Sequence, residues 1–180
     1  MVDILNFILF LDSLPGNDGM NLSLSNVRSN FAKHEIVSTL QCGGNRRAQL
    51  EEAGEQCQGL KWGIGAISTA RFGGAKLADV LAEIGISSLK EAQRRGIKHV
   101  HFIGQDDPYD ASIPIETALD PQKDVLLAYE MNGEEMPAEH GYPIRVVVPG
   151  HIAARQVKWL REIVLSHEES ASGWQRWCPV

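Results

Sequence analysis

The chain has 180 residues and a mass of 19.8 kDa, the size of one ordinary domain rather than several. Hydrophobic residues make up 43% and charged residues 22%, close to the average of globular proteins, which excludes a disordered or fibrous chain. The 17 Lys and Arg residues against 23 Asp and Glu residues give a formal net charge of -6, which argues against a general nucleic-acid-binding protein.

An apolar run at residues 4–11 stands near the start of the chain. It is far shorter than the roughly 20 residues that cross a bilayer, so no membrane association is expected. Asp3 stands where a secretory signal has basic residues, and the first arginine, Arg28, comes too late for a mitochondrial presequence. We interpret the run as a buried or mispaired apolar segment, and the sequence by itself indicates no compartment.

The next segment, 13–21, is rich in Pro, Gly, Asn and Asp and predicts a linker. Residues 74–84 predict the one clear helix, because their apolar side chains recur at i, i+3, i+4 and i+7 and Gly85 follows. Four runs rich in β-branched or apolar residues predict strands: 34–41, 99–103, 125–131 and 144–148.

Asn132-Gly133 predicts a hairpin turn after the third of these strands. Residues 157–165 allow a strand or a helix, and their β-branched content favours a strand. Together these elements predict a single α+β domain with a mixed sheet.

Cys42 lies in the most informative loop. Three cysteines cannot form a disulfide framework, so cysteine chemistry should belong to a single thiolate. Cys42 follows a predicted strand and precedes a glycine pair, with Arg46 and Arg47 close behind, and such a positive field favours a thiolate that binds metal or attacks a substrate. The two arginines also favour anion binding. The alternative is a small buried cysteine at a strand end. Cys57 and Cys178 have no such neighbours and are interpreted as incidental.

Arg145 begins an otherwise apolar strand, and a buried arginine needs a partner. That partner can be a protein carboxylate or a ligand phosphate, and the sequence favours neither. His140 lies in the loop before the same strand. No second Cys or His lies near Cys42 at zinc spacing, which argues against a zinc site. The phosphate-binding, dinucleotide-binding, zinc-peptidase and serine-hydrolase motifs are all missing from the sequence.

Three further groups of residues have a structural and a functional interpretation. Asp106, Asp107 and Asp110 follow a predicted strand, where binding residues often lie, but acidic turns are common. Gly73-Gly74 before the predicted helix could offer backbone N–H groups to an anion. The tryptophans are interpreted as core or interface residues rather than a binding platform: Trp159, Trp174 and Trp177.

Five motifs together resemble the molybdenum-cofactor domain of the eukaryotic sulfite oxidases: T-L-Q-C-G-G-N-R-R, W-G-I-G-A-I-S-T-A-R-F-G-G-A-K-L-A-D-V-L, V-L-L-A-Y-E-M-N-G, E-H-G-Y-P-I-R-V-V-V-P-G and V-K-W-L. The resemblance runs from about Leu22 to Arg176, in the same order and at compatible spacings. G-A-I-S-T-A-R and A-S-I-P are typical of the animal type rather than of the plant enzymes or nitrate reductases. The resemblance as a whole implies a molybdopterin-binding domain over 22–176, with divergent ends at 1–21 and 177–180.

The resemblance also implies site residues. Cys42 stands where the family's thiolate binds molybdenum, a sensible soft ligand beside the dithiolene of molybdopterin. Arg47 and Trp62 match residues of the sulfite pocket. Gln156 stands where animal enzymes often have His, a departure that a main-chain contact would tolerate. The remaining matches hold the pterin and its phosphate in the family: Asp106, His140, Arg145, Gln156, Val157 and Lys158.

The implied reaction converts sulfite and water to sulfate and leaves two electrons on molybdenum. The family passes them to a b-type haem domain and on to cytochrome c, in the mitochondrial intermembrane space. This sequence shows no haem domain, no presequence and no dimerisation domain. It also lacks the family's Arg-Asn-His and Arg-Asp-Tyr-Lys segments. A catalytically impaired fragment or non-catalytic remnant is therefore the alternative, and a nitrate reductase-type domain is the third choice.

Overall fold

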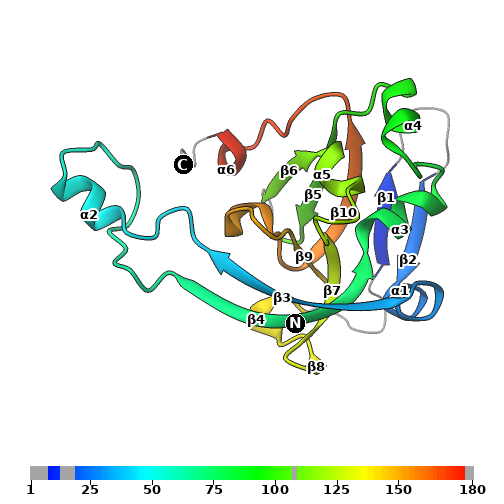
Figure 1. The fold of residues 1–180 in the computed structure, drawn as a ribbon, viewed down its shortest axis with the longest axis horizontal. Coiled ribbons are helices and arrows are strands. Elements are labelled where there is room, and N and C mark those ends of the chain that lie inside the picture. Colours follow the sequence, from blue (N-terminus) through cyan, green and yellow to red (C-terminus); the bar gives the residue numbers. More distant parts are fainter. Residues whose placement is uncertain (1–7, 13–18, 107–108, 177–180) are drawn as a thin grey trace.

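A computed structural model describes residues 8–12, 19–106 and 109–176, which form two sheets (Figure 1). The first sheet has the order β2 (Met20–Ser23), β1 (Ile8–Asp12), β10 (Leu160–Ser166), β5 (His99–Gly104) and β6 (Asp110–Pro114). The second has the order β3 (Lys33–Gln41), β4 (Ile67–Lys76), β7 (Leu126–Met131) and β8 (Glu134–Glu135), with β9 (Arg145–Val147) paired to β7. Only β1 and β10 pair in parallel in the described residues. This mixed architecture confirms the predicted fold class.

Short helices connect the strands: α1 (Leu24–Asn30), α2 (Arg47–Glu52), α3 (Leu77–Glu83), α4 (Leu89–Arg94), α5 (Ile115–Leu119) and α6 (Gly173–Arg176). Two 3-10 turns, η2 (Ala138–His140) and η3 (Ala153–Arg155), flank β9. Within the described ranges, none of these helices has the length and apolar character to cross a membrane.

One large hydrophobic core lies between the sheets and helices α3 to α5. Alternate residues of β5, such as Val100 and Phe102, are buried in it because a strand turns every second side chain to the same face. A smaller cluster around Phe72 and Met136 lies on the other face of the second sheet. The two clusters make residues of β7 buried on both faces, since Leu127 belongs to the first and Ala128 to the second.

Most predicted strands are confirmed, and so is the Asn132-Gly133 turn, whose two residues have φ values of 56° and 86°. Leu11 in β1 is fully buried, as expected for the apolar run. β10 begins at Leu160, later than predicted. Residues 20 and 21 lie in β2 rather than in a linker, and 13–18 lie outside the described residues.

The predicted helix boundary at residue 74 is wrong. The helix begins at Leu77, and Gly73 and Gly74 lie in β4, so they offer no N–H groups to an anion at a helix start. A Cβ on Gly74 would lie 2.1 Å from the Leu127 carbonyl oxygen, at a bulge in the β4–β7 pairing. Glycine stands there because β4 and β7 approach too closely for a side chain. The sequence predicts no strand at β2, β4 or β6, and no helix at α1, α2, α4, α5 or α6.

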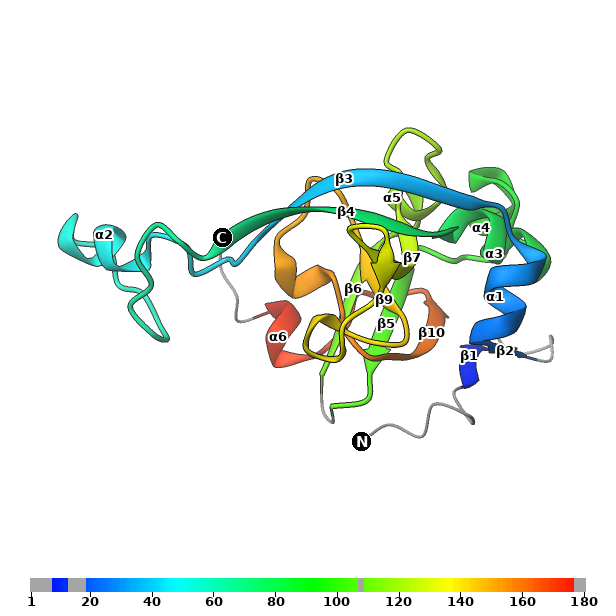
Figure 2. The ribbon, with the colours of Figure 1, turned by 90° about the horizontal axis from the view of Figure 1, so that it is seen from below.

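The β3–β4 ribbon extends beyond the body of the protein and carries residues 42–66 at its end, which we name the arm (Figures 1 and 2). Its helix α2 buries no side chain. Exposed large apolar residues are concentrated on the arm: Leu50, Leu60, Trp62 and Ile64.

Candidate functional site

Arg145 supplies a buried positive charge in the body. It is 5% exposed, and its guanidinium stacks on the Phe72 ring. Nη1 donates to the His140 carbonyl (2.8 Å) and Nη2 to the Gln156 carbonyl (3.1 Å), whereas Nε has no partner. No carboxylate of the described residues forms an ion pair with it. Burial lowers its pKa to about 10, so it remains charged at neutral pH. Of the two partners expected for Arg145, a ligand anion fits this arrangement.

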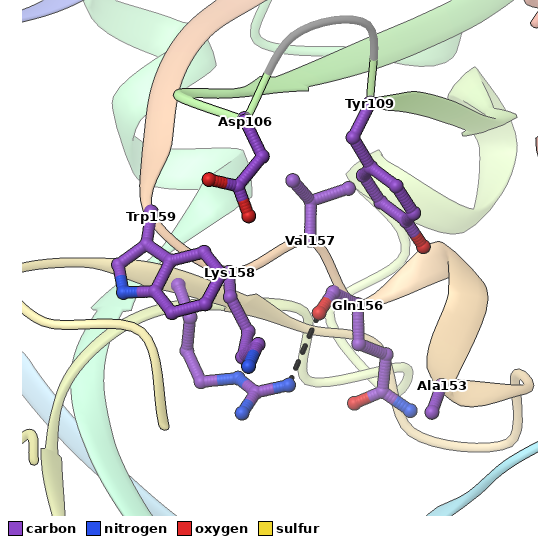
Figure 3. Close-up of a pocket in the computed structure, with 9 residues that line it drawn as sticks. Asp106, Tyr109, Ala153, Gln156, Val157, Lys158 and Trp159 are labelled. Carbon is purple, nitrogen blue, oxygen red and sulfur yellow. Dashed lines mark hydrogen bonds between the residues drawn. The ribbon is translucent and has the colours of Figure 1, made fainter. Parts of the chain in front are cut away.

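A cavity of about 290 Å³ opens beside Arg145 (Figure 3). Its wall includes four successive residues, Gln156 to Trp159, together with Asp106 and Tyr109. Gly141 makes close packing behind it possible: its φ is 114°, and a Cβ there would lie 3.0 Å from Lys158 Cβ and 3.1 Å from Arg145 Cβ. The Lys158 pKa is lowered, first by burial and then by the Arg145 charge. The cavity is thus a preformed cationic pocket.

Two of the predicted cofactor residues hold the Arg145 guanidinium through their main-chain carbonyls. The carbonyls of His140 and Gln156 accept the hydrogen bonds of Arg145, while the His140 residue itself is exposed in η2 and is not part of the cavity wall. The Gln156 side chain accepts from Val148 N–H (3.2 Å) and donates to the His151 carbonyl (2.9 Å). A glutamine at this position therefore fixes the 148–151 turn.

Cys42 lies at the junction of β3 and the arm. Its N–H donates to the Ala66 carbonyl (3.0 Å), which closes the ribbon, and Asn45 Oδ1 accepts from Ala66 N–H (3.0 Å). The Gly44 N–H donates to the Cys42 sulfur at 3.4 Å. These main-chain bonds fix the position of the thiol at the base of the arm.

Arg47 and Trp62 lie together next to Cys42. A Cβ on Gly44 would lie 2.8 Å from both Arg47 Nη2 and Trp62 Cδ1, so glycine is needed for their close approach. Arg47 Nη1 donates to the Leu60 carbonyl (2.8 Å). Residues 42, 44, 47 and 62 line a cavity of about 590 Å³, to which α6 contributes Trp174. Arg46 does not join them: its Nε donates to Gln49 Oε1 (2.6 Å).

A third, shallow cavity of about 390 Å³ lies between the Arg145 cavity and the Arg47 cavity. It shares Ala153 with the Arg145 cavity and shares Cys42 and Trp62 with the Arg47 cavity. A Cβ on Gly43 would contact Ile152 Cδ1 at 3.4 Å, which places the two segments side by side. A long ligand could therefore extend from Arg145 to Cys42.

The sequence matches the profile of one protein family over most of its length. The profile described as "Oxidoreductase molybdopterin binding domain" matches residues 5–174, almost the whole chain. The chain belongs to this family.

Relatives within the family include sulfite oxidase of Gallus gallus, 52% identical over 90% of this chain and 35% of the relative. Mitochondrial sulfite oxidase of Homo sapiens is 51% identical over 90% of this chain and 29% of the relative. Nitrate reductase [NADH] 1 of Phaseolus vulgaris is 40% identical over 80% of the chain and 17% of the relative. The sulfane dehydrogenase SoxCD of Paracoccus pantotrophus has a similar structure, with a TM-score of 0.78 and 26% identity over 96% of this chain and 41% of that one. These matches confirm the animal-type resemblance. The chain spans about a third of the length of the sulfite oxidases.

The donor set fits a molybdopterin-type cofactor. A phosphate-bearing ligand would offer a counter-charge to Arg145, which has no carboxylate partner, and a soft thiol lines the neighbouring cavities. The described residues hold no cluster of three or more His, Cys, Asp or Glu that could bind a metal ion unaided.

Sequence reasoning missed several wall residues. Tyr109 and Ala153 line the Arg145 cavity, and Ala153 also lines the third cavity. Trp159 and Trp174 were expected in a core or interface, but Trp159 lines the Arg145 cavity and Trp174 is 52% exposed beside the Arg47 cavity. No pattern in the sequence would have found small or aromatic wall residues. Asp107, Trp177 and Cys178 lie outside the described residues.

Proposed function

We propose that this domain binds molybdenum-molybdopterin and oxidises sulfite to sulfate. One observation carries the proposal: a buried guanidinium without a carboxylate partner and a cysteine thiol line neighbouring cavities that share wall residues. The family membership and the sulfite oxidases among the relatives support it.

The residues of the body would hold the cofactor. Arg145 and Lys158 would bind the phosphate, because two nearby cations and several N–H donors suit a dianion. Asp106, Val157 and the 156 main chain would face the pterin. When bound, the cofactor supplies two-electron redox chemistry and oxygen transfer to the substrate.

The arm would supply the metal ligand and bind the substrate. The Cys42 thiolate would ligate molybdenum. Arg47 is held at Nη1 by the Leu60 carbonyl, so the rest of its guanidinium can donate to a sulfite oxygen and stabilise the charge of the oxyanion. Trp62 would form the wall beside it and exclude water from the anion. Overall, sulfite and water would give sulfate, two electrons and two protons.

The wider setting follows the relatives. Domain boundaries at 22–176 are proposed, with the segment 1–21 contributing β1 to the first sheet. Electrons would leave to a b-type haem domain or cytochrome c. The names of relatives support a mitochondrial location, and the resemblance implies the intermembrane space.

The full chain, expressed in a molybdopterin-producing host, tests the proposal. We expect about one molybdenum and one pterin per chain, and sulfite-dependent reduction of ferricyanide. Cys42→Ser should abolish turnover, whereas Cys57→Ser, the matched change at the other described free cysteine, should leave it unchanged. Pterin-free protein, or full activity of the Cys42→Ser variant, would contradict the assignment. Pterin-loaded protein without turnover would point to a non-catalytic domain.

The two arginines should separate binding of cofactor from binding of substrate. Arg47→Gln should reduce kcat/KM for sulfite by about 100-fold with pterin content unchanged, because one charge-stabilising donor is removed. Arg145→Gln should instead reduce the pterin content. Equal loss of pterin in both variants would exclude separate roles.

A further inference from the structure

Trp159 adopts a backbone conformation that bulky residues rarely take. Its φ is 48°, in the left-handed region where large side chains are outliers. Hydrogen bonds from three parts of the chain hold this segment: Gln105 N–H to the Trp159 carbonyl (2.9 Å), the Trp159 indole N–H to the Ala138 carbonyl (2.8 Å) and Leu160 N–H to the Ile144 carbonyl (2.9 Å). Such a conformation persists only where its surroundings fix it, and it is typical of ligand sites.

The segment before β10 places successive side chains on one wall of the cavity. In a regular strand, successive side chains point to opposite faces of the sheet. Residues 156–159 precede the strand, which begins at Leu160, and all four line the cavity. Lys158 and Trp159 therefore lie side by side on this wall (Figure 3).

Lys158 is held in place by this ring. Its Nζ lies 4.0 Å from the centroid of the Trp159 ring and donates to the Glu139 carbonyl (2.9 Å). A cation over the face of a tryptophan is attracted to it, whereas a free lysine would extend its ammonium into water. Repulsion from the Arg145 charge acts in the same outward direction. Without the ring, only the Glu139 carbonyl of these two partners would hold the Lys158 ammonium.

We propose that Trp159 is a positioning residue for the anionic end of the ligand: it holds the Lys158 ammonium beside the Arg145 guanidinium, so that both cations bind one phosphate group. This inference rests on the proposed function. Trp159 belongs to neither hydrophobic core of the described residues, and its ring lies against the Lys158 ammonium instead.

A double-mutant cycle tests the inference with two measurements that need no turnover. The variants are Trp159→Ala, Lys158→Met and the pair together, with Trp159→Phe as a variant that keeps an aromatic ring. Pterin retained per folded chain is measured after gel filtration, and the affinity of the apo chain for inorganic phosphate by calorimetry. Trp159→Ala and Lys158→Met should each weaken phosphate binding by about tenfold, and the pair by no more than Lys158→Met alone.

The outcomes distinguish the role of Trp159 from the proposed function of the domain. A multiplied loss of about 100-fold in the pair would show that Trp159 does not act through Lys158, and overturns the inference. If Trp159→Ala does not fold, Trp159→Phe and its pair with Lys158→Met complete the cycle, with a smaller loss expected. If the wild-type protein binds phosphate but no pterin, and the double variant loses no more phosphate affinity than Lys158→Met alone, the proposed function is overturned and the inference is kept. Protein that binds neither overturns both.

Discussion

The body and the arm provide the two ends of the site by different means. In the body, Arg145 is buried and held by two carbonyls and the Phe72 ring beside a cavity of about 290 Å³. On the arm, α2 buries nothing, and no atom lies within 4 Å of a Cβ placed on Gly54, Gly63 or Gly65. The end that would hold the phosphate is therefore rigid and preformed, whereas the end that carries Cys42 has few tertiary contacts.

The difference indicates how the two ends would contribute to binding. A preorganised cationic pocket loses little entropy when an anion binds, whereas ordering a loosely packed arm reduces the affinity. Affinity for the cofactor would then come mainly from the body, and the arm would supply selectivity for the metal and the oxyanion. Paired substitutions in the two regions test this comparison.

The largest contrast is expected for two leucines. Leu127 in β7 is fully buried, and Leu60 on the arm is 72% exposed. Leu127→Ala should lower the free energy of unfolding by about 3 kcal/mol, because it leaves a cavity. Leu60→Ala should change it by less than about 0.5 kcal/mol. Urea denaturation measures both. A similar loss for Leu60→Ala would show that the arm packs as tightly as the body.

Two glycines give the next contrast. Gly74→Ala would bring a Cβ to 2.1 Å from the Leu127 carbonyl oxygen and should cost about 2 kcal/mol, because β4 and β7 must separate. Gly63→Ala meets no atom within 4 Å, and its effect should stay within about 0.5 kcal/mol. Thermal unfolding of the two variants measures the difference. Tolerance of alanine at 74 would contradict the close β4–β7 approach.

The body was more predictable from the sequence than the arm. In the run 99–103 every second side chain is buried, and this alternation leaves a direct pattern in the residues. The β4 strand was hidden because Gly73 and Gly74 are chosen for the approach of another backbone, a tertiary demand that local propensity cannot express. The helix start was misplaced for the same reason.

The site was predictable only in its charged and sulfur groups. Arg145 among apolar residues, and Cys42 before a glycine pair, are unusual enough to be noticed in a sequence. The left-handed backbone of Trp159 depends on hydrogen bonds from the Gln105 N–H and to the Ala138 carbonyl, which lie far apart in the chain. The main-chain role of His140 depends likewise on folding, because every residue has a carbonyl and none is marked by its side chain.

Two glutamines should show a smaller contrast. Gln175 in α6 is buried, and its Oε1 accepts from the N–H of Ser112 on the edge strand β6 (3.0 Å). Gln175→Ala leaves that buried N–H without a partner and should cost about 1 kcal/mol. On the arm, Gln49 bonds to the exposed Arg46, so Gln49→Ala should have almost no effect. Chemical denaturation compares the two variants, and equal effects would contradict the attachment of α6 to β6.

The smallest contrast concerns ion pairs and pH. In α4, hydrogen bonds from Arg94 and Arg95 hold the pKa of Glu91 below its usual value of 4.5. A lowered folded pKa means that the pair stabilises the protein above pH 4.5 and that this contribution is lost as the pH falls through the folded value. Glu91→Gln should therefore lower the melting temperature slightly at pH 7, and by less as the pH falls below 4.5.

An ion pair on the arm, between Lys61 and Glu51, has the opposite pH dependence. The hydrogen bond to Glu51 raises the pKa of Lys61, so any stabilisation by this pair exists below pH 10.5 and is lost as the pH rises through the folded value. Both partners lie on the arm, and such exposed pairs contribute little. Because the arm adds little to the stability of the body, Lys61→Met should leave the melting temperature unchanged between pH 3 and about pH 9. A decrease at pH 7 as large as that of Glu91→Gln would show that the arm unfolds together with the body. The distinction between a well-packed body and a loosely packed arm would then fail.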